Sequence, residues 1–232
     1  MKPECVTWKP GIPIIIGSMT AASVRAYAAM LAAGVVYVDS RERNLPLRHS
    51  HHRYAILGPN GVQKLTLPLV GATNAMHVPM CDVRVSEHAN WRHLHWGALF
   101  SAYGRTPYFD YIADDLHQLL LGDDALQDDS LLNFNERLQH LIIEFLDLPI
   151  KVAPLPRNFT QTTDNKEDTE HYYDLRRVLG AKKPDGLPIT DVPYYQLWAD
   201  RHGFTPNLSI LDLLMNEGRE AIFTLMKMTS QS

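Results

Sequence analysis

Two compact runs of apolar, largely β-branched residues stand out in the first third of the chain. Residues 12–16 and 35–39 each predict a buried strand. The segment between them has helical spacing of its apolar residues, and Thr20 is placed to cap a helix over residues 20–31. This β-α-β order predicts a parallel pair of strands with Asp39 at a carboxyl end. Open α/β sheets bind ligands at that edge.

The pattern then alternates as in a hairpin before it becomes helical. Residues 53–57 and 64–70 predict two antiparallel strands, because Gly58-Pro59-Asn60-Gly61 between them is a turn sequence, and residues 81–85 predict one more strand. Helical spacing follows over these segments: 88–103, 107–121, 130–146, 194–201, 207–216 and 219–227. We therefore predict a mixed α/β fold, with a βαβ unit plus a hairpin sheet in residues 1–86 and mainly helices in residues 87–232, in a single domain spanning 1–232.

Several boundaries can be predicted from individual residues. Thr106 followed by Pro107 is typical of an N-cap and first helical position. The acidic stretch 123–129 is expected to be a solvated loop, and residues 154–166 a strand with a loop. Gly218 is expected to separate the last two helices.

Composition excludes several classes of protein. The chain has 232 residues, 45% of them hydrophobic, with a net charge of −4, which argues against a nucleic-acid binder. Two cysteines make no disulfide framework and no metal motif, and neither a membrane-spanning run nor a signal peptide is recognised. We expect a cytoplasmic protein with a small-molecule substrate, no cofactor and no metal. The oligomeric state does not follow from the sequence.

Residues 91–111 combine tryptophan, tyrosine, histidine and arginine in one short stretch. Each of these side chains carries a polar group that needs a partner when buried, so the stretch predicts either a pocket wall or a specific polar core. On a helix, one face would carry His88, Trp91, Arg92, His95, Leu99, Ala102 and Tyr103. His93 and Trp96 point elsewhere, which excludes a helical metal pair of His93 and His95. The face either offers Arg92 and His95 to an anionic or sugar-like ligand, or packs as a satisfied core.

Other candidate residues are weaker. His49, His51 and His52 form a cluster that leaves metal binding undecided, although a solvated basic loop is the simpler interpretation. Arg53 is expected at the mouth of the hairpin, where it can reach an anion. Residues 17–20 join a strand to a helix and offer backbone N–H groups to a phosphate. Asp110, Asp114 and Asp115 are most simply read as a favourable charge near a helix start.

The tail, residues 203–218, predicts a capped amphipathic helix. Leu208, Leu211, Leu214 and Met215 form an apolar stripe. Asn207 or Ser209 caps it, and Asp212 follows Ser209 at the spacing of a capping box.

The runs 91–116 and 203–218 resemble the WbqC-like proteins of bacterial polysaccharide gene clusters. The first contains Ser101-Ala102-Tyr103-Gly104 followed by Pro107-Tyr108-Phe109, and the second contains Asn207-Leu208-Ser209-Ile210 followed by Asp212-Leu213-Leu214. Tyr195-Gln196 and the hairpin with Arg53 also fit. The chain departs from the family pattern at residues 16–23 and 50–52, which implies altered specificity or lost activity if those positions bind substrate.

The resemblance implies a role in O-antigen or related glycan assembly, with aminoacyl or acyl transfer to an amino sugar as the leading hypothesis. In that reading His95 is the base, and Asn207 and Asp212 orient the acceptor. Arg53 and Arg92 would hold phosphate or carboxylate groups, and the rings of Trp96, Tyr103 and Tyr108 would wall a nucleotide-linked sugar. Two alternatives stay open: a non-catalytic binding or scaffold protein of the same system, and a nucleotidyl-transfer enzyme suggested by the β-α-β unit and Asp39.

Overall fold

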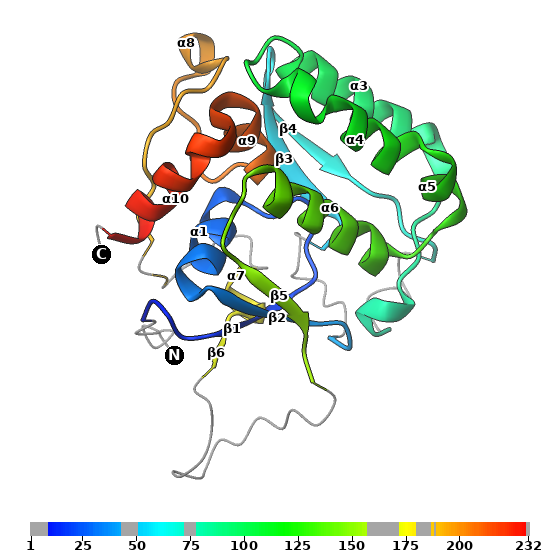
Figure 1. Ribbon diagram of the computed structural model, residues 1–232. Helices are drawn as coiled ribbons and strands as arrows, with labels where there is room; N and C mark the ends of the chain where they lie inside the picture. The colour runs from blue at the N-terminus through cyan, green and yellow to red at the C-terminus, as the bar shows by residue number, and fades with distance from the viewer. Residues whose placement is uncertain are drawn as a thin grey trace, which may run out of the picture.

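A parallel sheet and an antiparallel hairpin form the strand framework of the protein (Figure 1). The computed structural model describes residues 9–42, 51–71, 78–156, 172–179, 187 and 189–230. In this part of the chain the parallel sheet has four strands in the order β5-β2-β1-β6. The strands are β1 (Ile14–Gly17), β2 (Val35–Asp39), β5 (Lys151–Pro154) and β6 (Tyr173–Asp174). The mixed α/β fold and the parallel pairing of β1 with β2 are confirmed.

The crossover helix α1 (Val24–Ala33) begins later than predicted. Ser23 is its N-cap and accepts a hydrogen bond from the backbone N–H of Ala26. The prediction that Thr20 caps this helix is wrong because the Thr20 hydroxyl bonds to distant partners, His51 and Asn135. The connection from Gly17 to α1 is almost wholly buried as a result.

The predicted hairpin is present and consists of β3 (Arg53–Gly58) and β4 (Gly61–Thr66), with Gly61 at a positive φ of 99°. Its second strand begins and ends earlier than the predicted range 64–70. The strand predicted over residues 81–85 is wrong in its first half. A short 3-10 helix, η1 (Met80–Asp82), stands there, because its backbone N–H groups bond to the loop that follows β2. Only isolated bridges remain at Arg84 and Val85.

The remaining helices lie mainly in the C-terminal two-thirds, as predicted. Their bounds are η2 (His88–Asn90), α3 (Trp91–Tyr103), α4 (Phe109–Leu121), α5 (Asp123–Gln127), α6 (Leu131–Phe145), α7 (Arg176–Leu179), α8 (Ala199–His202), α9 (Ile210–Glu217), η3 (Gly218–Glu220) and α10 (Ala221–Ser230).

Three of the predicted boundaries need correction. Thr106 does not cap α4, because its hydroxyl donates to the carbonyl of Tyr103 and the helix begins only after Tyr108. The acidic stretch 123–129 contains α5 instead of being all loop, and the helix predicted over 194–201 is the single turn α8. In the segment 154–166, only residue 154 belongs to a strand, because β5 ends there. Residues 157–166 lie outside the described residues.

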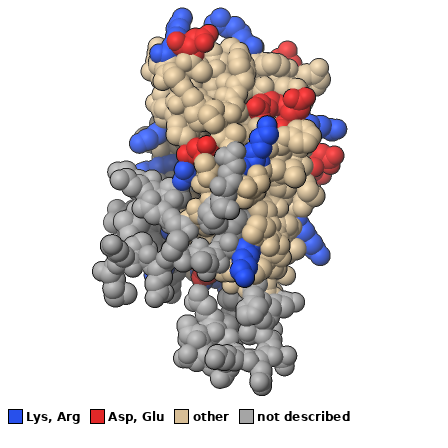
Figure 2. Space-filling model, turned by 90° about the vertical axis from the view of Figure 1, so that its left-hand side faces the viewer, with Lys and Arg blue, Asp and Glu red and all other residues tan. Residues whose placement is uncertain are grey.

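One apolar core joins the sheet to the helices. It includes β1, α1, α3, α9 and α10, and α10 packs against α1. No helix in the described ranges is long and apolar enough to cross a bilayer. Figure 2 shows that acidic and basic side chains are interspersed with broad neutral areas on the face it presents, without a field of one sign.

Candidate functional site

The inward face of α3 carries all the residues predicted from its periodicity except His88, which is exposed and lies before the helix, in η2. Its buried residues are Trp91, Arg92, His95, Leu99, Ala102 and Tyr103, whereas His93 is exposed. The helix lies against β3 and α9 on one side and α4 on another. The polar groups on this face therefore meet protein partners, which we describe in turn.

Arg92 is only 4% exposed and lies between the end of α4 and Glu87, the residue before η2. Its Nη1 donates to the carbonyl of Leu120 in the last turn of α4, at 3.1 Å. Its Nε and Nη2 lie 3.0 Å and 2.9 Å from Glu87 Oε1, and the guanidinium stacks on Trp91 at 4.6 Å. These contacts satisfy an orphan helix-end carbonyl and pair the buried cation.

His95 is 3% exposed and uses both ring nitrogens. Nε2 lies 3.3 Å from the carbonyl of Thr66, which can only accept, so Nε2 carries the proton and Nδ1 accepts from the Tyr54 hydroxyl at 3.1 Å. Burial lowers the pKa of His95 to about 4, against a smaller upward effect of the Thr66 hydrogen bond. The predicted role of His95 as a base stays a prediction, and these contacts favour the alternative of a satisfied core histidine.

Tyr103 and Asp212 bring the two runs of the family resemblance into direct contact. The Tyr103 hydroxyl donates to Asp212 Oδ1 at 2.9 Å and accepts from the backbone N–H of Leu57 at 3.3 Å. Asp212 Oδ2 accepts from Tyr194 at 2.7 Å and from Gln196 at 2.8 Å. We call Tyr103, Tyr194, Gln196 and Asp212 the buried junction.

Burial dominates the electrostatics of the buried junction. It raises the pKa of the Asp212 carboxyl, and the hydrogen bonds from Tyr194, Tyr103 and Gln196 offset part of this effect. The pKa values of Tyr103 and Tyr194 are also raised, first by burial and then by Asp212. The capping box predicted for Asp212 is wrong, because its carboxylate receives these side-chain donors while Ser209 alone caps α9.

The other predicted binding residues fall in different surroundings. Asn207 has a positive φ of 54°, and its Oδ1 accepts from the backbone N–H of Arg25 at 3.4 Å. Tyr108 covers Gly218, where an added Cβ would lie 2.4 Å from its ring. Trp96 is half-buried against Phe109 and His117, whereas Arg53 is exposed at the start of β3. Their substrate-binding roles stay predictions, and the structure does not gather them around one point.

The carboxyl edge of the parallel sheet holds a second set of polar residues, which we call the edge cluster: Ser18, Asp39, Glu42, His51, Asn135, Asp174 and Arg176. Asp39 and Asp174 end β2 and β6, and Arg176 bridges them. Its Nη1 lies 2.5 Å from Asp39, and its Nε and Nη2 lie 2.9 Å and 2.6 Å from the two oxygens of Asp174. The hydrogen bonds that the guanidinium donates to Asp174 are the main cause of the raised pKa of Arg176.

The ring of His51 lies beside Ser18, in the segment that follows β1. Its Nδ1 donates to the carbonyl of Ser18, and its Nε2 lies 3.9 Å from Glu42 Oε2. Gly17 makes this approach possible, since an added Cβ there would lie 2.1 Å from Glu42 Oε2 and 2.8 Å from His51 Cε1. A buried histidine beside a buried carboxylate is an arrangement that can accept and hold a proton.

Asn135 of α6 fixes this part of the edge cluster. Its Nδ2 donates to Ser18 Oγ and to the His51 carbonyl, both at 2.9 Å. The Thr20 hydroxyl lies 2.7 Å from the same carbonyl and 2.6 Å from Asn135 Oδ1, and donates its single proton to one of them. Three distant chain segments are thus tied together at one edge.

The sequence analysis found only part of the edge cluster. Asp39, His51 and residues 17–20 are recognised from the sequence as candidates, whereas Glu42, Asn135, Asp174 and Arg176 are not. A signal existed for Asn135, which interrupts the buried stripe of α6 formed by Leu131, Leu138 and Ile142. No group of three metal-ligating side chains occurs in the described ranges, and His49 lies outside them.

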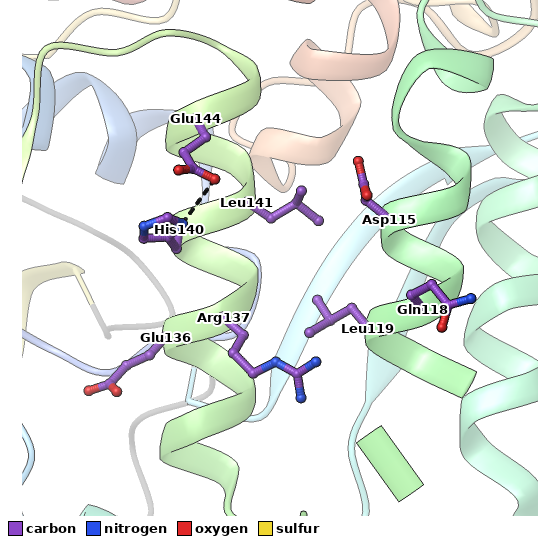
Figure 3. Close-up of a pocket in the computed structure, with 8 residues that line it drawn as sticks. All are labelled: Asp115, Gln118, Leu119, Glu136, Arg137, His140, Leu141 and Glu144. Carbon is purple, nitrogen blue, oxygen red and sulfur yellow. Dashed lines mark ion pairs between the residues drawn. The ribbon is translucent and has the colours of Figure 1, made fainter. Parts of the chain in front are cut away.

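A separate groove of about 470 Å³ runs between α4 and α6 (Figure 3). Leu119, Leu141 and Arg137 face the space between the helices, while Glu136 and His140 point away from it. His140 pairs with Glu144 at 3.1 Å within one helix, and both are largely exposed. This groove is a feature of the helical surface with mixed charge, and it lacks the convergent buried polar groups of the edge cluster.

Comparison with known proteins identifies relatives without a described activity. The model of the WbqC-like protein family matches residues 35–184, a range that includes α3 and most of the edge cluster. The chain is 27% identical over 216 residues to "Uncharacterized protein Rv1507c" of Mycobacterium tuberculosis, which covers 85% of this chain and 90% of that protein. No solved structure matches.

Proposed function

Because the chain belongs to the WbqC-like protein family, we propose that it acts in bacterial surface glycan assembly as a transferase that acylates or aminoacylates an amino sugar linked to a nucleotide. The observation that carries the proposal is the edge cluster. Buried or half-buried polar and charged side chains from β2, β6, α7 and the segment after β1 converge at the edge where open α/β sheets bind ligands. Such convergence of titratable groups is typical of functional sites.

Recognition of the sugar would rest on the two strand-end carboxylates. Asp39 and Asp174 accept hydrogen bonds, and carboxylates at strand ends suit hydroxyl and ammonium groups. Arg176 neutralises one of their two charges, which leaves a net negative site for a protonated amine. Arg53 begins β3 two residues after His51 and is exposed, so we keep it as the group that meets an anion.

Transfer requires a group that takes a proton from the amine. The bound ammonium group first releases one proton to solvent. The neutral amine nitrogen then attacks the acyl carbonyl of an activated donor, a C–N bond forms, and the nitrogen gives up a second proton as the bond to the leaving group breaks. The proton passes to His51, whose imidazolium the Glu42 carboxylate stabilises, and then to the leaving group. Asn135 and Ser18 hold the histidine in place. We assign this role to His51 because its buried ring lies beside the buried Glu42 carboxylate, at the edge of the sheet where the strand-end carboxylates converge.

The test is a comparison of two aspartate variants. Asp174 and Asp191 each bind an arginine through both carboxylate oxygens, and both side chains are 28% exposed. Only Asp174 lies at the carboxyl edge. With a uridine-diphosphate amino sugar, we expect Asp174→Asn to raise the Kd about tenfold, which corresponds to about 1.4 kcal/mol, and Asp191→Asn to leave it within about twofold.

Activity is tested by mass spectrometry after incubation with the same sugar and activated aminoacyl or acyl donors. The proposal expects an acylated product that is lost in His51→Gln. Binding that responds equally to both aspartate variants, or product formation that is unchanged in His51→Gln, would overturn it.

A non-catalytic binding or scaffold protein is the second candidate, and one observation favours it. Arg92, His95, Tyr103 and Asp212 are all buried and hydrogen-bonded within the protein, as expected of a polar core. Under this reading, ligand binding depends on Asp174 while no donor gives a product.

A further inference from the structure

Two arginine side chains converge on one tryptophan at the end of the molecule that carries α8. Trp198 immediately precedes α8, and its indole Nε1 donates to the carbonyl of Ala102 at 2.8 Å, which fixes the ring. The Cζ atom of Arg201 lies 5.5 Å from the ring centroid, and that of Arg105 lies 5.9 Å away. Arg201 belongs to α8 and Arg105 to the connection between α3 and α4, so the fold brings them together from distant segments.

Within the described residues, neither guanidinium has an ion-pair partner. No carboxylate there lies within ion-pair distance of Arg105 or Arg201, and the exposed Asp200, which precedes Arg201 in the sequence, pairs with neither. Arg92, which lies over the ring of Trp91, differs in this respect because it is paired with Glu87.

The surroundings hold this pair of cations in a defined place. His202, also in α8, bonds through Nε2 to the carbonyl of Pro59 at 3.1 Å, which ties α8 to the turn of the hairpin. Figure 2 shows Lys and Arg side chains together with acidic side chains at the upper end of the molecule, the height at which α8 lies in Figure 1. In a chain with a net charge of −4, two unpaired guanidiniums on one fixed ring are a local excess of positive charge.

We propose that Arg105, Arg201 and Trp198 form a binding site for the diphosphate group of a small molecule. Guanidinium groups present planar N–H pairs that match phosphate oxygens, and two of them match the charge of a diphosphate. Stacking on the indole restricts both side chains, so less conformational freedom is lost when the anion binds. A structural role would explain one arginine stacked on the ring. A second guanidinium on the same ring repels the first, so it has no structural benefit.

This site is distinct from the edge cluster. In Figure 1, α8 lies at the top and β6 at the bottom of the molecule. The inference does not depend on the proposed transferase function, and variants separate the two sites. Asp174→Asn is expected to leave binding at α8 unchanged.

The experiment is calorimetric titration of the whole chain with inorganic pyrophosphate at low salt, repeated with uridine diphosphate. We expect Arg105→Gln and Arg201→Gln each to weaken pyrophosphate binding at least fivefold and the double variant to abolish it. Arg137→Gln is the matched control, because Arg137 is an exposed arginine without an ion pair or a tryptophan in the described structure. Trp198→Leu should weaken binding severalfold while both arginines remain.

The outcomes separate clearly. Equal losses in Arg137→Gln and Arg105→Gln would show a general effect of charge and overturn the site, as would absence of pyrophosphate binding to the wild-type chain. Tighter binding of uridine diphosphate than of pyrophosphate, lost in the same variants, would support the site and identify a nucleotide as its source. Equal binding of the two probes would support the site with recognition confined to the diphosphate. Thermal denaturation of each variant checks that it is folded.

Discussion

Removal of one hydroxyl from the buried junction tests how strongly it holds the two halves of the fold together. In Tyr103→Phe, Asp212 Oδ1 loses a donor at 2.9 Å and the backbone N–H of Leu57 loses an acceptor at 3.3 Å. Tyr103 is 0% exposed and Asp212 is 1% exposed, so water does not replace the missing partner without rearrangement. A lost hydrogen bond to a carboxylate and an unsatisfied buried N–H together cost about 2–4 kcal/mol.

That loss is large compared with the total stability of about 5–15 kcal/mol expected for a folded protein. For a chain of this length it corresponds to a fall in Tm of about 5–15 °C. Urea denaturation followed by circular dichroism measures the free energy of unfolding directly. Tyr111→Phe is the matched control, because Tyr111 is 74% exposed and its loss of a hydroxyl should change stability by less than about 0.5 kcal/mol.

A double-mutant cycle isolates the contact itself. With Asp212→Asn as the partner change, the coupling between positions 103 and 212 should be at least about 1 kcal/mol, since the residues are in direct contact. If Tyr103→Phe unfolds at the same urea concentration as the wild type, or if the two changes are additive, the junction does not stabilise the fold as argued.

Three further changes probe other contacts. Burial lowers the pKa of His95 from 6.5 to about 4, so only the unfolded chain binds a proton between these values. Stability should be complete above pH 6.5 and fall by up to about 3 kcal/mol towards pH 4, and His95→Gln should flatten this fall in urea titrations while the exposed His140→Gln does not. Gly218→Ala should cost about 2–4 kcal/mol by thermal denaturation, because its Cβ meets a tyrosine ring, whereas Gly203→Ala, also at positive φ but in open space, should cost about 1–2 kcal/mol. Ser23→Ala should cost about 1 kcal/mol in urea denaturation through loss of the α1 cap.

The pattern of neighbouring residues predicted the strands that this pattern alone can specify. Strands β1 and β2 are short apolar runs, and the hairpin has its own turn sequence, so each could be read directly. β5 and β6 could not, because β5 is largely exposed and β6 has two residues, and both depend on pairing with strands far away in the sequence. The parallel neighbours of β1 and β2 are therefore defined by tertiary structure alone.

The errors at helix starts have the same cause. Thr20 and Thr106 are both good capping residues, yet neither caps a helix. Thr20 is drawn to His51 and Asn135, 31 and 115 residues away, and such competition from distant partners is invisible to a local rule. The inward face of α3 was predictable because it follows the helical period, but the partners of its polar groups were not.

The positions at which the chain departs from the family pattern meet in space. Residues 16–23 supply Ser18 and Thr20, and residues 50–52 supply His51. Ser18 accepts from the His51 ring, and the Thr20 hydroxyl lies 2.7 Å from the His51 carbonyl. Both segments thus belong to one hydrogen-bonded network around His51. Tyr103 and Asp212, from the two runs on which the family resemblance rests, lie instead in the buried junction.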